Sequence, residues 1–216
     1  MTSPFDVARL RKEYLLQGLR RSELAPDPFR QFEAWFDEAA KTSGQQEPNA
    51  MTLATSTPDG APSARVVLLK GFGPEGFAFY TNYESRKGQQ LASNPRAALN
   101  FYWPWLERQV QIEGNVVKMS REDSEAYFRL RPLGSRYGAL ASRQSRPLED
   151  RAELERNVAE AEAVHGPKPP MPSFWGGYRV LPARFEFWQG RENRLHDRFV
   201  YLPKPEGGWE IQRLSP

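Results

Sequence analysis

The sequence predicts a mainly β protein, an antiparallel barrel with α-helical additions. Six or more segments of the 216-residue chain alternate apolar and polar residues with the two-residue period of a β-strand. Gly, Pro and Asn separate most of them, which is typical of hairpin connections. Segments with helical spacing lie before and between the strands, and this combination favours a barrel with peripheral helices. A strongly twisted open sheet is the alternative.

Two helices are predicted before the first strand. Residues 7–19 carry apolar residues at helical spacing, with Arg and Lys between them. The second helix should begin with Asp27 as N-cap and Pro28 as the first helical residue. Its apolar stripe consists of Phe29, Phe32, Phe36 and Ala39.

The strands are expected from residue 50 onward. AMTLATS and SARVVLLK flank the turn TPDGAP and predict a hairpin. The further strands predicted are FAFYTN, AALNFYW, RQVQIEGNVVKM, FWGGYRV leading into RFEFWQ, RLHDRFVYL, and WEIQRL. Helices are predicted for residues 85–93, for residues 120–131, which end or kink at Pro132, and for residues 148–164.

Composition excludes several kinds of chemistry. The chain has no cysteine and only two histidines, so thiol nucleophiles, iron–sulfur clusters and histidine-rich metal sites are not expected. The absence of a secretory signal, of a long apolar run and of cysteine favours a cytoplasmic protein. There are 23 arginines and 7 lysines for a net charge of +3, but they are dispersed among acids. With no arginine-rich block or known motif, neither nucleic acid nor membrane is expected as a partner.

The stretch FEFWQGRENRLHDRF is the most informative part of the chain. Its alternation predicts two strands joined by a turn at residues 190–193. On the second strand Arg194, His196 and Arg198 should share one face, each roughly 6–7 Å from the next. Such a row of cations repels itself unless an anion lies among them. A solvated basic face is the alternative reading.

Two further groups of residues favour anion binding. Arg65 and Lys70 stand at the two ends of a hydrophobic strand, and they can serve one site only if the strand ends or twists by Lys70. The helix expected after Ser85 carries Arg86 and Lys87 in its first turn, where free N–H groups and two cations suit a phosphate. The alternative is a solvated helix end with unfavourably placed charges.

A second anion pocket is suggested by Tyr127 and Arg131, which share a helix face, and by Ser135, which could fold back beside them. Gln109 and the pair Gln144-Ser145 could hydrogen-bond a planar heterocycle. Coincidence and ordinary surface residues remain the alternatives for these groups. No Ser–His–Asp set, paired carboxylates, P-loop or dinucleotide fingerprint is present, so the reactive group of an enzyme should come from a phosphorylated cofactor.

The motifs RVVLLK, FYTN..SRK, ERQV, YF..RP..S, RQS, PSFWGG and EFWQG...RLHDR together resemble the pyridoxamine (pyridoxine) 5′-phosphate oxidases. The resemblance extends from Arg11 to the final residues LSP and implies an FMN-binding split β-barrel that forms a homodimer with FMN at the subunit interface. It implies residues 1–48 as a helical segment with a lid and residues 49–216 as the split-barrel part of a single domain.

The resemblance also implies roles for individual residues. FMN would be bound by Arg65, Val66, Val67, Leu68, Leu69, Lys70, Tyr80, Thr81, Arg86, Lys87, Gln109, Gln144, Ser145, Trp188 and Arg198. Substrate would be bound by the lid residues Arg11, Lys12, Glu13 and Tyr14, by Lys70, Tyr127, Arg131 and Ser135 at its phosphate, and by Arg194, Leu195 and His196 at its ring. Arg194 and His196 would be the catalytic pair.

The implied reaction oxidises pyridoxamine 5′-phosphate or pyridoxine 5′-phosphate to pyridoxal 5′-phosphate, with O₂ as electron acceptor and H₂O₂ released. Between two arginines, His196 should have a lowered pKa and be neutral near pH 7, able to accept a proton or a hydrogen bond. The alternatives are a flavin oxidase of the same fold acting on another aromatic substrate, as in phenazine biosynthesis, or a flavin-binding split barrel without activity.

Overall fold

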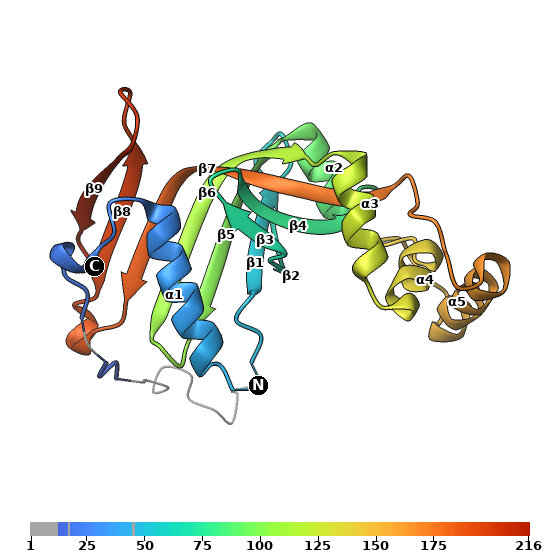
Figure 1. Ribbon diagram of the computed structural model, residues 1–216, viewed down its shortest axis with the longest axis horizontal. Coiled ribbons are helices and arrows are strands. Elements are labelled where there is room, and N and C mark those ends of the chain that lie inside the picture. Colours follow the sequence, from blue (N-terminus) through green and yellow to red (C-terminus); the bar gives the residue numbers. More distant parts are fainter. Residues whose placement is uncertain (1–12, 17, 45) are drawn as a thin grey trace, which may run out of the picture. The chain divides into compact units, whose positions relative to one another are not determined.

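The computed structural model describes residues 13–16, 18–44 and 46–216 and shows an antiparallel β-sheet with helical additions. The sheet has nine strands in the order β2-β1-β5-β6-β7-β4-β3, with β8 paired to β7 and β9 paired to β8. The strands are β1 (Ala50–Ser56), β2 (Pro62–Leu68), β3 (Gly71–Gly73), β4 (Gly76–Asn82), β5 (Arg96–Trp103), β6 (Arg108–Lys118), β7 (Trp175–Gln189), β8 (Asp197–Pro203) and β9 (Trp209–Leu214). Figure 1 labels these elements along the chain.

The chain forms two compact units. The described residues up to 48 form the first together with residues 100–111 and 184–216, and residues 49–99 and 112–183 form the second. The helices are α1 (Pro28–Thr42) in the first unit, and α2 (Arg86–Ser93), α3 (Arg121–Leu130), α4 (Leu133–Ala141) and α5 (Arg151–His165) in the second. The proposed division into a segment 1–48 and a single split-barrel domain stays a prediction. No helix in the described part of the chain is long and apolar enough to cross a membrane.

The second unit contains the predicted hairpin. β1 and β2 pair antiparallel from Ala50 opposite Leu68 to Ser56 opposite Pro62, and β4 pairs with the first half of β7. In β1 the alternate residues Met51, Leu53 and Thr55 are buried, as the alternation in the sequence predicts, whereas six of the seven residues of β4 are buried, so that strand is covered on both faces. Gly88, in α2, lies so close to Tyr83 that a Cβ would stand 2.1 Å from the Tyr83 carbonyl oxygen, and only glycine allows this approach.

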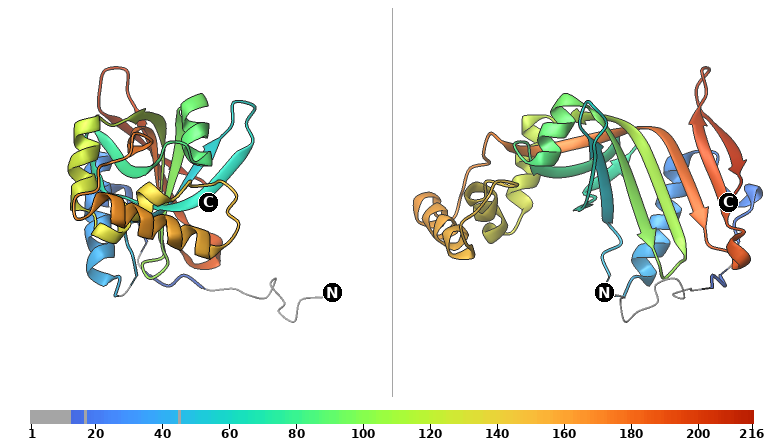
Figure 2. Two further views of the ribbon diagram at one scale, coloured as in Figure 1. Left: turned by 90° about the vertical axis from the view of Figure 1, so that its right-hand side faces the viewer. Right: turned by 180° about the vertical axis from the view of Figure 1, so that it is seen from behind.

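Helices α3, α4 and α5 follow one another in the second unit, and Figure 2 shows α4 and α5 adjacent in both of its views. Ser120 caps α3 through its side chain, as predicted. Pro132 ends α3 because it forces the residue before it, Arg131, into an extended conformation, with ψ at 145°. A separate helix, α4, begins immediately afterwards and was not predicted. Asp150 caps α5, and the helix begins at Arg151, three residues after the predicted start at residue 148.

The first unit is built on α1. Asp27 accepts a hydrogen bond from the Phe29 N–H, and Pro28 is the first helical residue, as predicted. Phe32 is fully buried and contacts Phe101 edge to face at 5.0 Å. A buried aromatic ring of this kind contributes roughly 1.5–3 kcal/mol of transfer free energy, so Phe32 helps to hold α1 in place.

The predicted helix over residues 7–19 is wrong where the structure describes it. Residues 13–16 and 18–19 are not helical, and residues 7–12 lie outside the described part. The N–H of Leu16 is donated to a carboxylate oxygen of Glu107 at 3.1 Å, and that of Leu19 to Asp197 at 3.0 Å. Side chains from distant parts of the sequence therefore satisfy the backbone groups that a helix would have used.

Candidate active site

A cluster of cations in the second unit lies where β2 ends and α2 begins. β2 ends at Leu68, so Lys70 has left the strand and lines the same pocket as Arg65. The condition set by the sequence for these two cations to serve one site is therefore met. Ser85 caps α2 by accepting the Gly88 N–H, and Lys87 lies in the first turn of that helix.

Neutral oxygen atoms hold the cations of this cluster. Arg65 donates from Nη1 to the Thr55 hydroxyl at 2.6 Å and to the Leu53 carbonyl at 3.2 Å. Lys87 donates from Nζ to Gln144 Oε1 at 2.8 Å and to the Thr81 hydroxyl at 3.1 Å. Within the described residues, neither cation forms an ion pair with a carboxylate. The positive charges in the pocket are oriented without being neutralised.

Burial changes the proton affinity of these groups. Burial, and then the nearby charge of Arg65, lowers the pKa of Lys87 to about 8. Burial, and then the charge of Arg86, also lowers the pKa of Arg65, whose guanidinium nevertheless stays charged at neutral pH. Both shifts indicate cations that lack a counter-ion, and an anion placed beside them would restore their affinity for protons.

An aromatic stack forms another wall. The ring of Tyr80 stacks on Tyr127 with centroids 4.0 Å apart and on Trp175 at 5.5 Å. Arg131 lies over Trp175, with its guanidinium carbon 4.7 Å from the ring centroid. Its Nη1 is buried without a hydrogen-bond partner among the described residues. A buried donor of this kind is costly unless a ligand accepts its hydrogen bond, and burial accordingly lowers the pKa of Arg131.

Most of the predicted residues of the second unit line one pocket of about 740 Å³. Its lining includes Arg65, Val66, Val67, Leu68, Lys70, Tyr80, Thr81, Lys87, Tyr127, Arg131, Ser135 and Gln144. Ser135 stands on α4, beyond Pro132, and so does fold back beside Tyr127 and Arg131. The set combines cations, hydroxyls and aromatic faces, and it fits a phosphorylated aromatic group in both charge and size.

Three predicted residues of this unit lie elsewhere. Leu69 is buried and uses its backbone N–H to bond the Asn49 carbonyl. Arg86 is exposed in the first turn of α2 and is not part of the pocket lining. Ser145 lines a neighbouring hollow of about 410 Å³ and has a left-handed backbone with φ of 71°.

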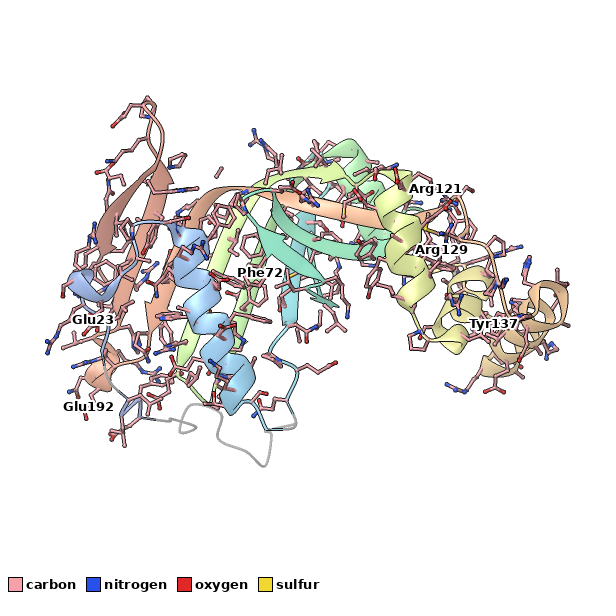
Figure 3. The ribbon with its side chains drawn as sticks, viewed as in Figure 1. Glu23, Phe72, Arg121, Arg129, Tyr137 and Glu192 are labelled. Carbon is pink, nitrogen blue, oxygen red and sulfur yellow. The ribbon has the colours of Figure 1, made fainter. Side chains whose placement is uncertain are left out.

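The first unit holds a second cluster, around His196. The predicted strand does not include Arg194 and His196, because β8 begins only at Asp197. Residues 192–194 instead form a 3₁₀ turn, η3 (Glu192–Arg194), where Figure 3 labels Glu192. Asn193 and Arg194 have left-handed backbones, with φ of 54° and 64°, and this curls the chain out of the strand. The expected row of three cations on one strand face is therefore wrong.

His196 lies in an aromatic setting within this unit. Its ring is 4.7 Å from that of Trp188 and 5.6 Å from that of Tyr14, centroid to centroid. Nδ1 accepts the backbone N–H of Arg191 at 3.1 Å. Burial, and then the charge of Arg194, lowers the pKa of His196. The direction of the predicted shift is confirmed, but its first cause is burial and Arg198 is not among its causes.

Arg198 is held by a buried carboxylate. Glu186 accepts from Arg198 Nε at 2.8 Å and pairs with Arg184 at 2.7 Å, and its side chain is only 5% exposed. Arg198 stands opposite Trp188 in the pairing of β7 with β8. A partner for this guanidinium was not foreseen, and it explains why the arginine does not need an anion beside His196.

The remaining predicted residues also belong to the first unit. Gln109 is half-buried on β6, Leu195 is exposed after η3, and Glu13 is exposed on the segment that carries Tyr14. Arg11 and Lys12 lie outside the described residues. Of the four residues predicted to form the lid, the structure therefore describes only Glu13 and Tyr14. A Cβ on Gly190 would lie 2.7 Å from the Tyr14 ring, so the close approach of this segment depends on that glycine.

Comparison with known proteins assigns the family. The family model described as pyridoxamine 5′-phosphate oxidase matches residues 36–165. A second, described as the pyridoxine 5′-phosphate oxidase C-terminal dimerisation region, matches residues 175–216. The chain belongs to the pyridoxamine 5′-phosphate oxidase family. It is an enzyme, an oxidase of the pyridoxine/pyridoxamine 5′-phosphate oxidase class.

Relatives within the family match the whole chain. The pyridoxine/pyridoxamine 5′-phosphate oxidase of Bordetella petrii is 60% identical over 98% of this chain and 100% of its own. That of Rubrobacter xylanophilus is 58% identical over 98% of this chain and 97% of its own.

Solved structures support the split-barrel fold. The structure of PhzG from Burkholderia lata 383, in complex with tetrahydrophenazine-1-carboxylic acid, superposes with a TM-score of 0.87 at 29% identity, covering 95% of this chain and all of that one. A pyridoxamine 5′-phosphate oxidase-related, FMN binding protein from Nostoc punctiforme superposes with a TM-score of 0.71 at 18% identity, covering 90% and 100%. The predicted fold class is confirmed.

Sequence reasoning missed three residues that line the oxidase pocket or hold its cations. Trp175, which completes the aromatic stack, lies in the motif PSFWGG, which resembles the family but was given no role. Thr55 and Gln90 hold Arg65 from β1 and α2, and both are only 4% exposed. Nothing in their local sequence marks them, because their contacts depend on how the hairpin and α2 come together.

Proposed function

We propose that this oxidase uses FMN to convert pyridoxine 5′-phosphate or pyridoxamine 5′-phosphate to pyridoxal 5′-phosphate, reducing O₂ to H₂O₂. With the amine substrate, water is also consumed and ammonia is released. The observation that carries the proposal is the pocket of the second unit, whose cations have no carboxylate partner among the described residues. We assign these cations to two groups, Arg65 with Lys87, and Lys70 with Arg131, the latter beside the hydroxyl of Ser135. Two groups suit two phosphates, one on the cofactor and one on the substrate.

The cofactor phosphate is assigned to Arg65 and Lys87, with the hydroxyl of Thr81 and the amide of Gln144 beside them. Bound there, FMN would supply the hydride acceptor for the C4′ carbon of the substrate and the carrier of electrons to O₂. Residues 66–68 of β2 line the pocket and offer backbone groups and apolar surface to a flat ring system. The protein's own contribution to this reaction is alignment.

The substrate phosphate is assigned to Arg131, Lys70, Tyr127 and Ser135. Arg131 has a buried donor without a partner and a guanidinium fixed over Trp175, so it is already oriented for an incoming phosphate. Because a phosphate does not change during the reaction, these residues should bind the ground state and the transition state equally.

The ring of the substrate is assigned to Arg194 and His196. Since Nδ1 of His196 already accepts the Arg191 N–H, the neutral imidazole carries its proton on Nε2 and offers a donor there. This modifies the expectation that His196 acts as an acceptor. Trp188 and Tyr14 surround the imidazole and restrict its rotation.

We further propose that the oxidase acts as a homodimer with FMN at the subunit interface. The support is the match of residues 175–216 to a dimerisation region. A ligand held by two subunits favours the associated state by mass action. Sedimentation of the FMN-loaded protein at micromolar concentration tests this, and a fully loaded monomer would contradict it.

A second candidate is an oxidase of an unphosphorylated aromatic compound. The similarity to PhzG in complex with tetrahydrophenazine-1-carboxylic acid is the observation in its favour. The group of Lys70, Tyr127, Arg131 and Ser135 argues against it, since such a substrate has no phosphate for it to bind. The identity of 60% to a pyridoxine/pyridoxamine 5′-phosphate oxidase, against 29% to PhzG, argues the same way.

The proposal is tested by denaturing the purified protein, which should be yellow, and separating the released flavin by chromatography. FMN is expected, because Arg65 and Lys87 suit one terminal phosphate. Mainly FAD or riboflavin would contradict the cofactor assignment. Formation of pyridoxal 5′-phosphate from pyridoxine 5′-phosphate, followed by its absorbance, separates the two candidate functions.

A further inference from the structure

The guanidinium of Arg65 is fixed by a short chain of uncharged groups. Its Nη1 donates to the Thr55 hydroxyl at 2.6 Å, and that hydroxyl donates to Gln90 Oε1, also at 2.6 Å. Arg65 Nη2 reaches the same Gln90 oxygen at 3.4 Å. Because a hydroxyl has one proton, donating it to Gln90 turns the lone pairs of Thr55 toward Arg65.

Gln90 is itself held rigidly. It is 4% exposed, and its amide Nε2 donates to the Ser63 hydroxyl at 2.8 Å. It lies on α2, the helix whose first turn carries Lys87, so one short helix presents a cation and also orients another. Both polar ends of the Gln90 side chain are thus used, and its position is fixed from two strands.

Arg65 differs from several other arginines of the chain because the groups that hold it are uncharged. Arg198 is paired with Glu186, Arg108 with Glu38 and Arg213 with Asp197. A carboxylate at position 90 would hold Arg65 more firmly than an amide does, since charged hydrogen bonds are roughly twice as strong. It would also cancel the charge that a phosphate needs. A glutamine orients the guanidinium and leaves its charge available.

We propose that Gln90, acting through Thr55, is a positioning residue that fixes Arg65 for the phosphate of the cofactor while leaving its charge uncompensated. The inference rests on the proposed function, because it takes FMN as the phosphate ligand. It also explains why the buried residue beside Arg65 is an uncharged glutamine. The contribution of Gln90 should appear in binding that depends on the phosphate and not in binding of the flavin ring.

The decisive variant is Gln90→Glu. It has the same size, its carboxylate can accept from Thr55 and Arg65, and the Ser63 hydroxyl can turn to donate to it, so the whole hydrogen-bond chain can persist. Dissociation constants of the flavin-free protein for FMN and for riboflavin would be measured by the quenching of flavin fluorescence. We expect FMN binding to weaken by roughly 10–100-fold, the size of one lost charge-assisted contact, with riboflavin binding changed by less than about 2-fold.

The outcomes separate the two claims. If the unaltered protein binds FMN no more tightly than riboflavin, the phosphate site of the proposed function fails. If it prefers FMN and Gln90→Glu keeps that preference, the role assigned to Gln90 is wrong. An equal loss of both flavins also contradicts the role, because it indicates a merely structural effect.

A second pair of variants keeps the proposal testable should Gln90→Glu fold poorly. Thr55→Val has nearly the shape of threonine but removes the hydroxyl that Arg65 bonds, whereas Thr55→Ser keeps it. We expect Thr55→Val to lose roughly 10-fold in FMN affinity without losing riboflavin affinity, and Thr55→Ser to restore most of the difference. Equal FMN affinity in the valine and serine variants would overturn the inference.

Discussion

The backbone N–H of Arg191 is donated to Nδ1 of His196 at 3.1 Å. This bond closes the loop that carries Arg194, and it requires an unprotonated Nδ1. A protonated imidazole has a donor on both nitrogens, so it cannot accept this bond. The conformation of the loop and the protonation state of His196 are therefore linked.

The first prediction concerns the pKa of His196. It should lie below the usual 6.5, because burial and then the charge of Arg194 disfavour the imidazolium. Arg194→Ala should raise the pKa only part of the way, since burial is the larger cause. Imidazole chemical shifts followed against pH measure both values. A His196 pKa above 6.5 in the unaltered protein would contradict the account.

The sign of the effect on stability follows from the same shift. Because the folded pKa is lowered, the unfolded state binds more protons in the interval between the two pKa values. The stabilisation is fully present above pH 6.5 and is lost as the pH falls through the folded pKa. The effect should be small, because His196 is only partly buried.

The second prediction concerns Lys87. Its pKa of about 8 in the unliganded protein means that it begins to lose its proton at mildly alkaline pH. FMN affinity should therefore fall as the pH rises through 8, whereas riboflavin affinity should not. Calorimetry in buffers of different ionisation enthalpy should detect proton uptake on binding FMN near pH 8. Absence of proton uptake would contradict the contact between Lys87 and the phosphate.

The third prediction separates binding from chemistry. Arg131→Ala removes a contact to a phosphate that does not change in the reaction, so KM should rise by about 10–100-fold, or roughly 1.5–3 kcal/mol, with kcat little changed. Arg194→Ala should instead lower kcat, because a displacement of about 1 Å from the reacting geometry can cost on the order of 100-fold. Steady-state kinetics with pyridoxine 5′-phosphate decide between these effects. A variant of Arg194 that kept its kcat and changed only KM would refute the orienting role.

The fourth prediction concerns the buried ion pairs of Glu186. Glu186→Gln removes the buried carboxylate that pairs with Arg184 and Arg198, which should cost about 3 kcal/mol of the free energy of unfolding. The matched control is Glu155→Gln, whose ion pair with Arg151 is exposed and should be worth less than about 0.5 kcal/mol. Urea denaturation measures both. Equal effects of the two substitutions would contradict the structural importance of Glu186.

Sequence reasoning succeeded where local pattern decides the structure. The hairpin of β1 and β2 and the cap and stripe of α1 follow from alternation, turn residues and the Asp27-Pro28 pair. The sequence also indicated that Arg65 and Lys70 can serve one site only if the strand ends or twists by Lys70. β2 ends at Leu68, so this condition is met.

Sequence reasoning failed where contacts with residues far away in the sequence decide the local structure. The segment before Leu19 has helical periodicity, but its N–H groups bond Glu107 and Asp197 instead. Arg194 and His196 follow the alternation of a strand, yet the left-handed residues Asn193 and Arg194 turn the backbone away. The contacts of Gln90 and Glu186 could not be predicted, because they join residues on different elements.

The most direct test of the account is peroxide release by the FMN-loaded protein. Pyridoxine 5′-phosphate should produce H₂O₂ in a one-to-one ratio with pyridoxal 5′-phosphate. Unphosphorylated pyridoxine, the matched control, should produce far less at the same concentration, since Lys70, Arg131 and Ser135 then have no phosphate to bind. Equal rates with the two compounds, or no peroxide with pyridoxine 5′-phosphate, would contradict the central claim that this pocket binds a phosphorylated substrate for oxidation.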